Sequence, residues 1–364
     1  MLEVADIVRL HGDEYRAAFG SQLTSVQKKV LRDIQNCRTP FFGGHVHRCD
    51  HCAQKVYAYH SCRNRSCPKC HRDQTNRWMA QQRQRLLPCS YYLITFTLPA
   101  PLRAIARSHP KRVYGLMIKA AAAALQKLTD DPRFLGARVG ILAVLHTWTR
   151  AMLYHPHVHL LVTAGGLSAD GTRWIEPKNP KFLVPVRALS LIFRAKMCAA
   201  LKKAGLLERI GSGVWIKPWV VHCQHAGSGE KVLQYLSRYV FRIAITNNRL
   251  ERIDDGLITF QYRDNKTQAV KHCTISGIEF LQRFLQHVLP RGCTKVRYYG
   301  IFSPHCRTPL DQVRPLIDRP PKPAADKSSE DQSSDSVSPP LRVCPYCRIG
   351  KLLLVETVQR IRSP

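Results

Sequence analysis

The sequence YHPHVHLLV, residues 154–162, decides how the rest of the chain is interpreted. Apolar residues alternate with histidines in this stretch, which is the period-two pattern of a half-buried β-strand. His157 and His159 are therefore expected on one face of the strand, with Val158 packed behind them. Two imidazoles held on a rigid strand make half of a metal site, and His155 has the same parity. A strand whose histidines simply face solvent is the alternative.

The residues that precede this strand extend the site. Residues 140–148 also have the pattern of a strand, and a short connection near Arg150 leads into the next one. In an antiparallel hairpin that turns there, His146 falls opposite His157, and directly opposed residues share a face. His146 is therefore a candidate third metal ligand. The alternative is an ordinary histidine at the edge of the core.

The charge of the chain indicates its kind of partner. Lys and Arg number 56 against 25 Asp and Glu, which gives 364 residues a formal net charge of +31. Such an imbalance predicts a polyanionic partner, with nucleic acid as the first choice. We expect no membrane association, because no run of about 18 apolar residues and no charged-then-apolar leader is found. The 14 cysteines then indicate metal ligation and buried thiols rather than a disulfide framework.

Two CxxC pairs, separated by fourteen residues, predict a structural zinc site. Cys49 and Cys52 form the first pair and Cys67 and Cys70 the second, and together they fit one tetrahedral four-thiolate site. Nearby side chains could replace a ligand or build a second site: Cys37, His45, His47, His60 and Cys62. Basic residues crowd the second pair and are expected to grip phosphates, unless they form only a solvated face. They are Arg63, Arg65, Lys69, Arg72 and Arg77.

The remaining hydrophobic patterns predict an α+β fold, an antiparallel sheet flanked by helices. Helices are expected at 1–36, 78–87, 111–128, 230–240 and 279–288, and strands at 91–99, 215–221 and 296–300, with a hairpin at 257–275. The strand that carries His157 is expected to end at a turn at residues 165–166.

Five segments are expected along the chain. They are a helical segment (1–36), a zinc-binding DNA-recognition module (37–88), the sheet domain (89–305), a largely disordered linker (306–340) and a C-terminal tail (341–364). The tail contains a lone CxxC, Cys344 and Cys347. We favour a small zinc element there that could borrow His305 and Cys306; a redox pair, or no specific role, is the alternative.

A pair of tyrosines is spaced for one helix face. Tyr235 and Tyr239 are four residues apart in the expected helix, so they lie one above the other. Arg238 and Arg242 are close by in the sequence. Taken alone, such a pair is most often a packing feature.

Several short motifs, in this order, resemble the HUH endonucleases. In detail the chain is similar to the two-tyrosine rolling-circle transposases of the insertion sequence 91 family, from about Cys37 to Tyr299. The motifs are SCRNRSCPKC (61–70), FTLP (96–99), LHTW (145–148), HPHVH (155–159), YLSRY (235–239) and AITNNR (244–249).

The resemblance implies an HUH-nuclease-type sheet and a chemistry. Tyr235 and Tyr239 would attack the scissile phosphodiester of one DNA strand and leave a 5′-phosphotyrosine and a free 3′-hydroxyl. His157 and His159 would hold Mg²⁺ or Mn²⁺, with His146 as third ligand and Gln234 as its competitor. Arg238 and Arg242 would favour the phenolate and contact DNA.

The resemblance also implies a substrate and a location. Single-stranded or hairpin DNA at the ends of a mobile element would be the partner, gripped by cations and aromatic stacking. The location would be the bacterial cytoplasm, in association with the nucleoid. The DNA sequence and the oligomeric state are left open.

Two other classes of protein compete with this interpretation. A plasmid replication initiator or relaxase-like nickase shares the chemistry, although the chain lacks the GxxxxGK[ST] phosphate loop of a fused helicase. A non-catalytic zinc-finger DNA-binding protein would explain the charge and the cysteines, but not the histidines and the tyrosine pair. Metal-dependent nicking distinguishes the non-catalytic DNA-binding protein from the enzymes.

Overall fold

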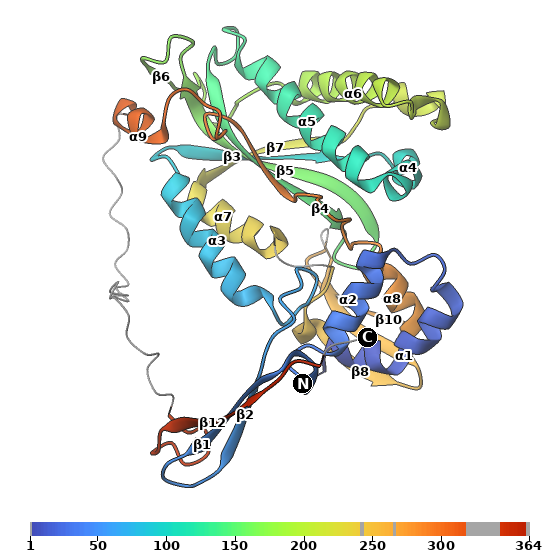
Figure 1. Ribbon diagram of the computed structural model, residues 1–364. Coiled ribbons are helices and arrows are strands. Elements are labelled where there is room, and N and C mark those ends of the chain that lie inside the picture. Colours follow the sequence, from blue (N-terminus) through green and yellow to red (C-terminus); the bar gives the residue numbers. More distant parts are fainter. Residues whose placement is uncertain (1, 241–243, 265–266, 318–342, 362–364) are drawn as a thin grey trace.

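The computed structural model describes residues 2–240, 244–264, 267–317 and 343–361, without the side chains of 71–73, 238 and 239. The fold is α+β, as predicted (Figure 1). Three parts are visible: a central sheet between two layers of helices, a smaller lobe of helices and strands, and a projecting β-arm.

The central sheet is antiparallel throughout and has the order β11-β4-β5-β3-β7, with β6 beside the end of β5. Its strands are β3 (Ser90–Thr97), β4 (Arg138–Trp148), β5 (Tyr154–Leu167), β6 (Trp174–Ile175), β7 (Val221–Ser228) and β11 (Val296–Gly300). The predicted register is confirmed, because His146 pairs directly with His157.

Helices cover both faces of this sheet (Figure 1). α4 (Arg103–Ser108), α5 (Pro110–Thr129) and α6 (Val186–Lys203) lie on one face, and α3 (His71–Arg85) and α7 (Gly229–Val240) lie on the other. Side chains of β5 alternate between the two layers. Val158 and Leu160 are fully buried in the core with α5 and α6, and Leu161 packs in the core with α7. His157 and His159 share the parity of Leu161 and therefore face the α7 side.

Two expectations for the strands were wrong. β5 does not end at residues 165–166, because Gly166 allows the strands to stay close: a Cβ there would lie 2.6 Å from the carbonyl oxygen of Arg138. The segment 215–221 is not a strand either, and β7 begins only at Val221. Trp219 is buried instead and its indole donates to the carbonyl of Val214 at 3.0 Å, next to a proline that has no N–H for a strand ladder.

The smaller lobe joins the N-terminus to a distant part of the chain. It consists of α1 (Val4–Phe19), α2 (Ser25–Gln35), β8 (Leu250–Asp254), β9 (Leu257–Arg263), β10 (Val270–Ser276) and α8 (Gly277–Leu285). Ile7, Leu31, Phe260 and Phe280 are all fully buried in its one core. The N-terminal helices reach Cys37 and Cys67 of the cysteine module, but most of their core is shared with β8–β10 and α8, since these elements complete the apolar face of α1.

The arm is a three-stranded antiparallel sheet in which the two ends of the chain meet. β1 (Gly44–Cys49) is its central strand, between β2 (Lys55–Tyr59) and β12 (Leu352–Val358) of the tail. The tail is therefore part of the N-terminal module in space. Of the expected linker 306–340, residues 310–313 form α9 (Leu310–Val313), and residues 318–340 lie outside the described part.

Candidate active site

Three histidines converge on the face of the central sheet that α7 covers. The ring centroids of His146 and His157 are 4.4 Å apart, and those of His157 and His159 are 4.8 Å apart. One ring nitrogen from each lies within 4.8 Å of the others, close enough to share a metal ion. His155 is not part of this group, and its Nδ1 lies 2.9 Å from a guanidinium nitrogen of Arg103.

Hydrogen bonds orient two of the three rings. Nδ1 of His157 donates to the carbonyl oxygen of His155 at 2.7 Å, so in a neutral ring its Nε2 carries the lone pair. That Nε2 lies 2.6 Å from Nδ1 of His146. Nδ1 of His159 is 2.9 Å from the hydroxyl of Thr95, the residue paired with it on β3. Such outer hydrogen bonds are typical of metal-binding imidazoles.

Burial keeps these imidazoles neutral. It lowers the pKa of His157 to about 4 and that of His159 to about 3, since there is little water to stabilise the imidazolium. The pKa of His146 is held well below its usual value by burial and then by the charges of His157 and His159. Neutral imidazole is the metal-binding form, so the donor set fits a divalent cation.

Tyr235 lies beside the histidines and lines the same cavity, of about 650 Å³. Its ring centroid lies 6.0 Å from that of His159, and 36% of the residue is exposed. α7 can lie this close to the sheet because its first residue is Gly229, where a Cβ would lie 2.6 Å from the ring of Tyr91. Gln234 is exposed on the same helix. The side chain of Tyr239, the second predicted nucleophile, lies outside the described part of the chain.

The opposite wall of the cavity comes from the smaller lobe and was not predicted. Arg249, Tyr262 and Arg263 line it, together with Arg150 and Trp148 from the β4–β5 hairpin. The guanidinium of Arg249 donates to the carbonyls of Gln261, Ala244 and Arg150 and so joins the two lobes. Trp148 and Arg249 end two of the short motifs, LHTW and AITNNR, but no local pattern places any of these residues at the cavity, because they meet only through the packing of the lobe against the hairpin.

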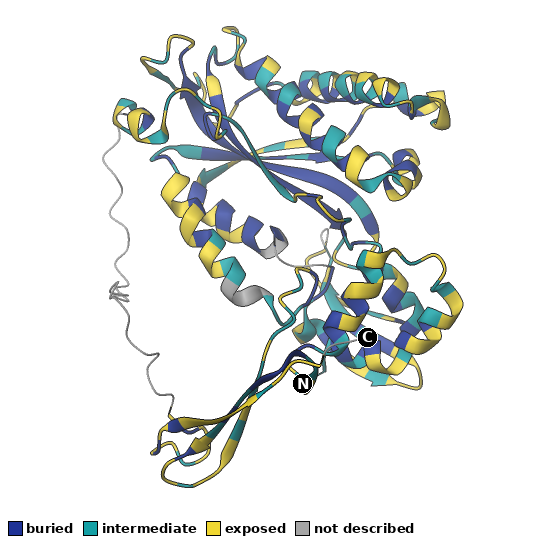
Figure 2. Cartoon of the chain, viewed as in Figure 1, coloured by how far each residue is buried: buried dark blue, intermediate teal, exposed yellow. Residues whose placement is uncertain are grey.

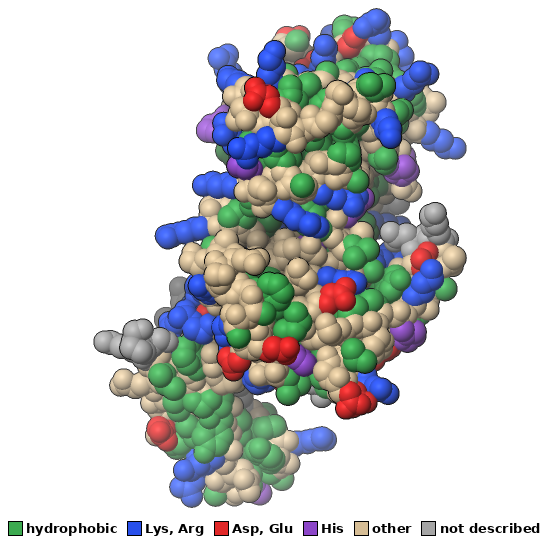
Figure 3. Space-filling model, turned by 90° about the vertical axis from the view of Figure 1, so that its right-hand side faces the viewer, with side chains coloured by type: hydrophobic (Ala, Val, Ile, Leu, Met, Phe, Trp, Pro, Cys, Tyr) green, Lys and Arg blue, Asp and Glu red, His purple; other side chains and the backbone are tan. Residues whose placement is uncertain are grey.

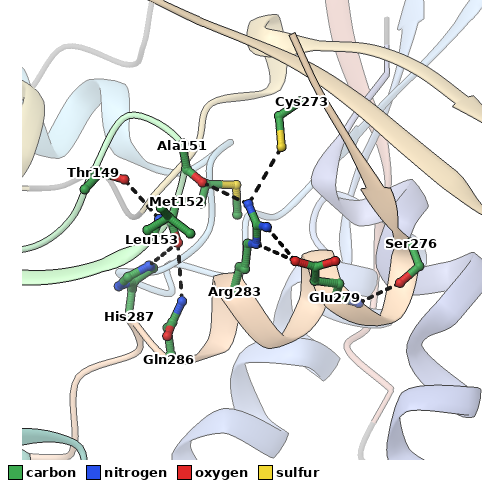
Figure 4. A network of polar contacts seen from close by, with 10 residues as sticks. All are labelled: Thr149, Ala151, Met152, Leu153, Cys273, Ser276, Glu279, Arg283, Gln286 and His287. Carbon is green, nitrogen blue, oxygen red and sulfur yellow. Dashed lines mark hydrogen bonds and ion pairs between the residues drawn. The ribbon is translucent and has the colours of Figure 1, made fainter. Parts of the chain in front are cut away.

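Helix α8 and the residues that follow it contact the turn between β4 and β5 (Figure 4). This pair of strands carries His146, His157 and His159 and forms the histidine hairpin. Arg283 donates to the carbonyl of Ala151 at 3.3 Å, and His287 bonds the carbonyl of Met152 at 3.1 Å. Glu279 holds the guanidinium of Arg283 in place. Met152 has a positive φ of 61°, a backbone conformation that such contacts stabilise. The smaller lobe therefore fixes the turn between His146 and His157.

The predicted zinc ligands belong to two different sites, and the assignment of Cys49, Cys52, Cys67 and Cys70 to one site was wrong. Cys67 and Cys70 lie with Cys37 and Cys62 beside the smaller lobe, whereas Cys49 and Cys52 lie in the arm. The reason is that β1 and β2 carry the first pair away from the second along an extended hairpin (Figure 1). The cluster at Cys37 has sulfur separations of 3.4 and 3.5 Å, which suits four thiolates around zinc.

The predicted phosphate-binding cations differ in their surroundings. Arg63 is exposed. Arg65 donates to the carbonyls of Leu289, Pro290 and Cys293, and Lys69 forms an ion pair with Glu3 at 2.6 Å, so both bind within the protein. The side chains of Arg72 and Arg238, and all of Arg242, lie outside the described part.

The surface agrees with the overall charge. In Figure 3, Lys and Arg side chains are spread over the body, acidic ones are fewer, and apolar side chains gather on the arm. No helix in the described part of the chain is long and apolar enough to cross a bilayer.

The fold and site define a class: a basic, cysteine-rich protein with a histidine triad and a tyrosine around one cavity. A family model described as "Transposase zinc-binding domain" matches residues 7–98, and one described as "Putative transposase" matches residues 140–309. The protein named "Putative transposase y4qJ" of Sinorhizobium fredii is 39% identical over the whole chain and 97% of its own length. The transposase for insertion sequence element IS801 of Pseudomonas savastanoi pv. phaseolicola is 28% identical over 77% of the chain and 71% of its own length.

The chain belongs to the insertion sequence 91 family of transposases. No solved structure gives a significant match.

Proposed function

We propose that this transposase nicks and rejoins single-stranded DNA by a rolling-circle mechanism with a 5′-phosphotyrosine intermediate. The observation that carries the proposal is the position of Tyr235, which lies beside the histidine triad and lines the same cavity. A nucleophile and an electrophilic site for one phosphate are thereby brought together in one place. Tyr239, one helical turn further on, would serve the second strand exchange.

The chemistry follows from the two sides of the cavity. The hydroxyl oxygen of Tyr235 bonds to phosphorus, the bond from phosphorus to the 3′ oxygen breaks, and that oxygen leaves as a 3′-hydroxyl after taking up a proton. The phenol loses its own proton to the surrounding water. One phosphodiester replaces another, so the step needs no ATP. A divalent cation, Mg²⁺ or Mn²⁺, held by His146, His157 and His159, would supply positive charge at the phosphate oxygens.

The protein itself would hold the strand on both sides of the cut. Arg150 and Arg263 are exposed at the rim of the cavity and suit the flanking phosphates. Tyr262, half-buried at the cavity wall, offers aromatic surface for an unpaired base, which a duplex would keep stacked inside the helix. We therefore favour an unpaired or hairpin-borne strand, processed in the bacterial cytoplasm at the nucleoid.

The test is cleavage of end-labelled single-stranded DNA that carries a candidate element end, with Mg²⁺, Mn²⁺ or neither. Wild type, Tyr235→Phe, Tyr239→Phe and the double variant are compared on denaturing gels for a covalent protein–DNA adduct. We expect a metal-dependent adduct that the double variant loses. Tyr299→Phe is the matched control: Tyr299 lies on β11 and packs against the core of the opposite face, so its variant should form the adduct normally. DNA binding without an adduct in every metal would contradict the proposal and favour a binding module.

A further inference from the structure

The lone CxxC of the tail has a partner at the other end of the chain. The sulfur atoms of Cys49 and Cys347 lie 3.7 Å apart, as do those of Cys52 and Cys344. All four sulfurs lie within 4.8 Å of one another. Zn–S bonds of about 2.3 Å in a tetrahedron place sulfurs about 3.8 Å apart, so the spacing fits one zinc ion. None of the four is in a disulfide.

The two CxxC loops of the arm have the same backbone design. Ala53 donates its amide to the carbonyl of Cys49, and Arg348 does the same to Cys344. Ala53 and Arg348 both have φ of 60°. Backbone amides also point at sulfur in both loops, from Cys52 to Cys49 and from Gly350 to Cys347, each at 3.4 Å. Amides that point at sulfur stabilise thiolates, the form in which cysteine binds zinc.

The two loops also fit against each other. The carboxylate of Asp50 accepts from the amide of Lys351 at 2.8 Å, and the amide of Asp50 donates to the carbonyl of Lys351. Gly350 packs so closely that a Cβ would lie 2.4 Å from the sulfur of Cys49. The contact is therefore specific to this pair of loops.

The arm has little else to hold it together. Among the described residues, the apolar cluster around its cysteines has three buried members, Cys49, Cys344 and Leu352, and Val46 is buried elsewhere on β1. The next residues of β12 are exposed, at 45% for Leu353 and 58% for Leu354. Most of the arm is coloured as exposed or intermediate in Figure 2. A sheet with so small an apolar core normally needs a metal or a disulfide.

We propose that Cys49, Cys52, Cys344 and Cys347 bind a second structural zinc ion, which fastens the C-terminal tail to the N-terminal module. The arm is then a zinc ribbon divided between the two ends of the chain. Cys306 is not the partner of the tail, because it packs near α9 in the core under α7. The proposal is independent of the nicking chemistry, since zinc content is measured without DNA.

The first test is the zinc content of the full-length protein by mass spectrometry of the metal. We expect two zinc ions per chain in wild type, one for each cysteine cluster, and one in Cys344→Ser/Cys347→Ser. The control Cys198→Ser/Cys306→Ser removes two cysteines outside both clusters and should keep two. Cys347→His keeps a ligand and should also keep two, which separates ligand loss from misfolding. One zinc ion in wild type, or two in the Cys344→Ser/Cys347→Ser variant, would overturn the proposal. Loss of a zinc ion in the control variant would also overturn it, and would indicate that the cysteines of the tail share their zinc with Cys306.

The second test asks whether the zinc fastens the tail. A site for a specific protease is inserted between residues 318 and 342, and the protein is cut. The tail fragment should co-elute with the body in size-exclusion chromatography and leave it in the Cys344→Ser/Cys347→Ser background. A fragment that leaves wild type at once would contradict the proposal.

Discussion

The histidine hairpin and the arm are both antiparallel β-structures that carry metal-ligand side chains, but different forces hold them. His146 and His157 are 11 positions apart, and helices cover both faces of their sheet. Cys49 and Cys347 are 298 positions apart in a sheet with almost no apolar core. Burial orders the hairpin before any ion binds. In the arm, zinc itself would supply the free energy, which reaches about 10–16 kcal/mol in zinc-finger peptides.

The difference assigns separate roles to the two kinds of metal. In the hairpin the fold is complete and the ion serves chemistry, so losing a ligand should cost activity rather than structure. In the arm, zinc stabilises the fold in place of a large apolar core, so losing a ligand should unfold the arm. The following experiments test this division, from the largest expected effect to the smallest.

Replacing a ligand of the hairpin should give the largest effect. We expect His157→Gln to slow nicking about 10²–10³-fold, the usual cost of removing one stabilising group from a transition state. The free energy of unfolding should change little, since glutamine keeps most of the volume and polarity. Single-turnover cleavage and chemical denaturation measure the two quantities. A variant with a lower free energy of unfolding but the wild-type nicking rate would contradict the catalytic role assigned to the metal of the hairpin.

Loosening a ligand should have a smaller effect. Thr95→Val removes the hydroxyl 2.9 Å from Nδ1 of His159 without changing the shape of the side chain. Loss of such an outer contact typically lowers metal affinity about 10–100-fold. We expect the nicking rate to recover at higher Mn²⁺ concentration. Thr274→Val, which removes a threonine pair in the smaller lobe, is the control and should need no extra metal.

The burial of the hairpin can be tested without its metal. In Gly166→Ala the added Cβ meets the carbonyl oxygen of Arg138 at 2.6 Å, so the two strands must separate. We expect a loss of about 1–3 kcal/mol in the free energy of unfolding, measured by urea denaturation. Gly213→Ala meets nothing within 4 Å and should change stability by less than about 0.5 kcal/mol. Equal effects of the two variants would mean that close strand packing does not stabilise the sheet.

The same contrast explains what could be predicted from sequence. The alternation around His157 and the short connection at Arg150 fix a register locally, so the pairing of His146 with His157 was correct. The zinc ligands were grouped by nearness in the chain, and that rule failed because an extended hairpin separates Cys52 from Cys67. Nothing near Cys344 in the sequence indicates β1 as its neighbour. The cavity wall formed by Tyr262 and Arg263 was not predicted for the same reason, since only tertiary packing brings these residues to the histidines.

The smallest expected effect concerns the surface of the cysteine module, where Arg63 and Arg65 are both exposed but the guanidinium of Arg65 is bound to three carbonyls. If Arg63 contacts a phosphate, Arg63→Ala should weaken DNA binding uniformly across sequences. It should also reduce the slope of log affinity against log salt by about 1. Arg65→Ala should instead lower the free energy of unfolding, because it removes the hydrogen bonds that tie the cysteine module to the segment after α8. Fluorescence anisotropy over a salt series and urea denaturation separate these outcomes. An unchanged slope in Arg63→Ala would show that this face of the module lies away from the DNA.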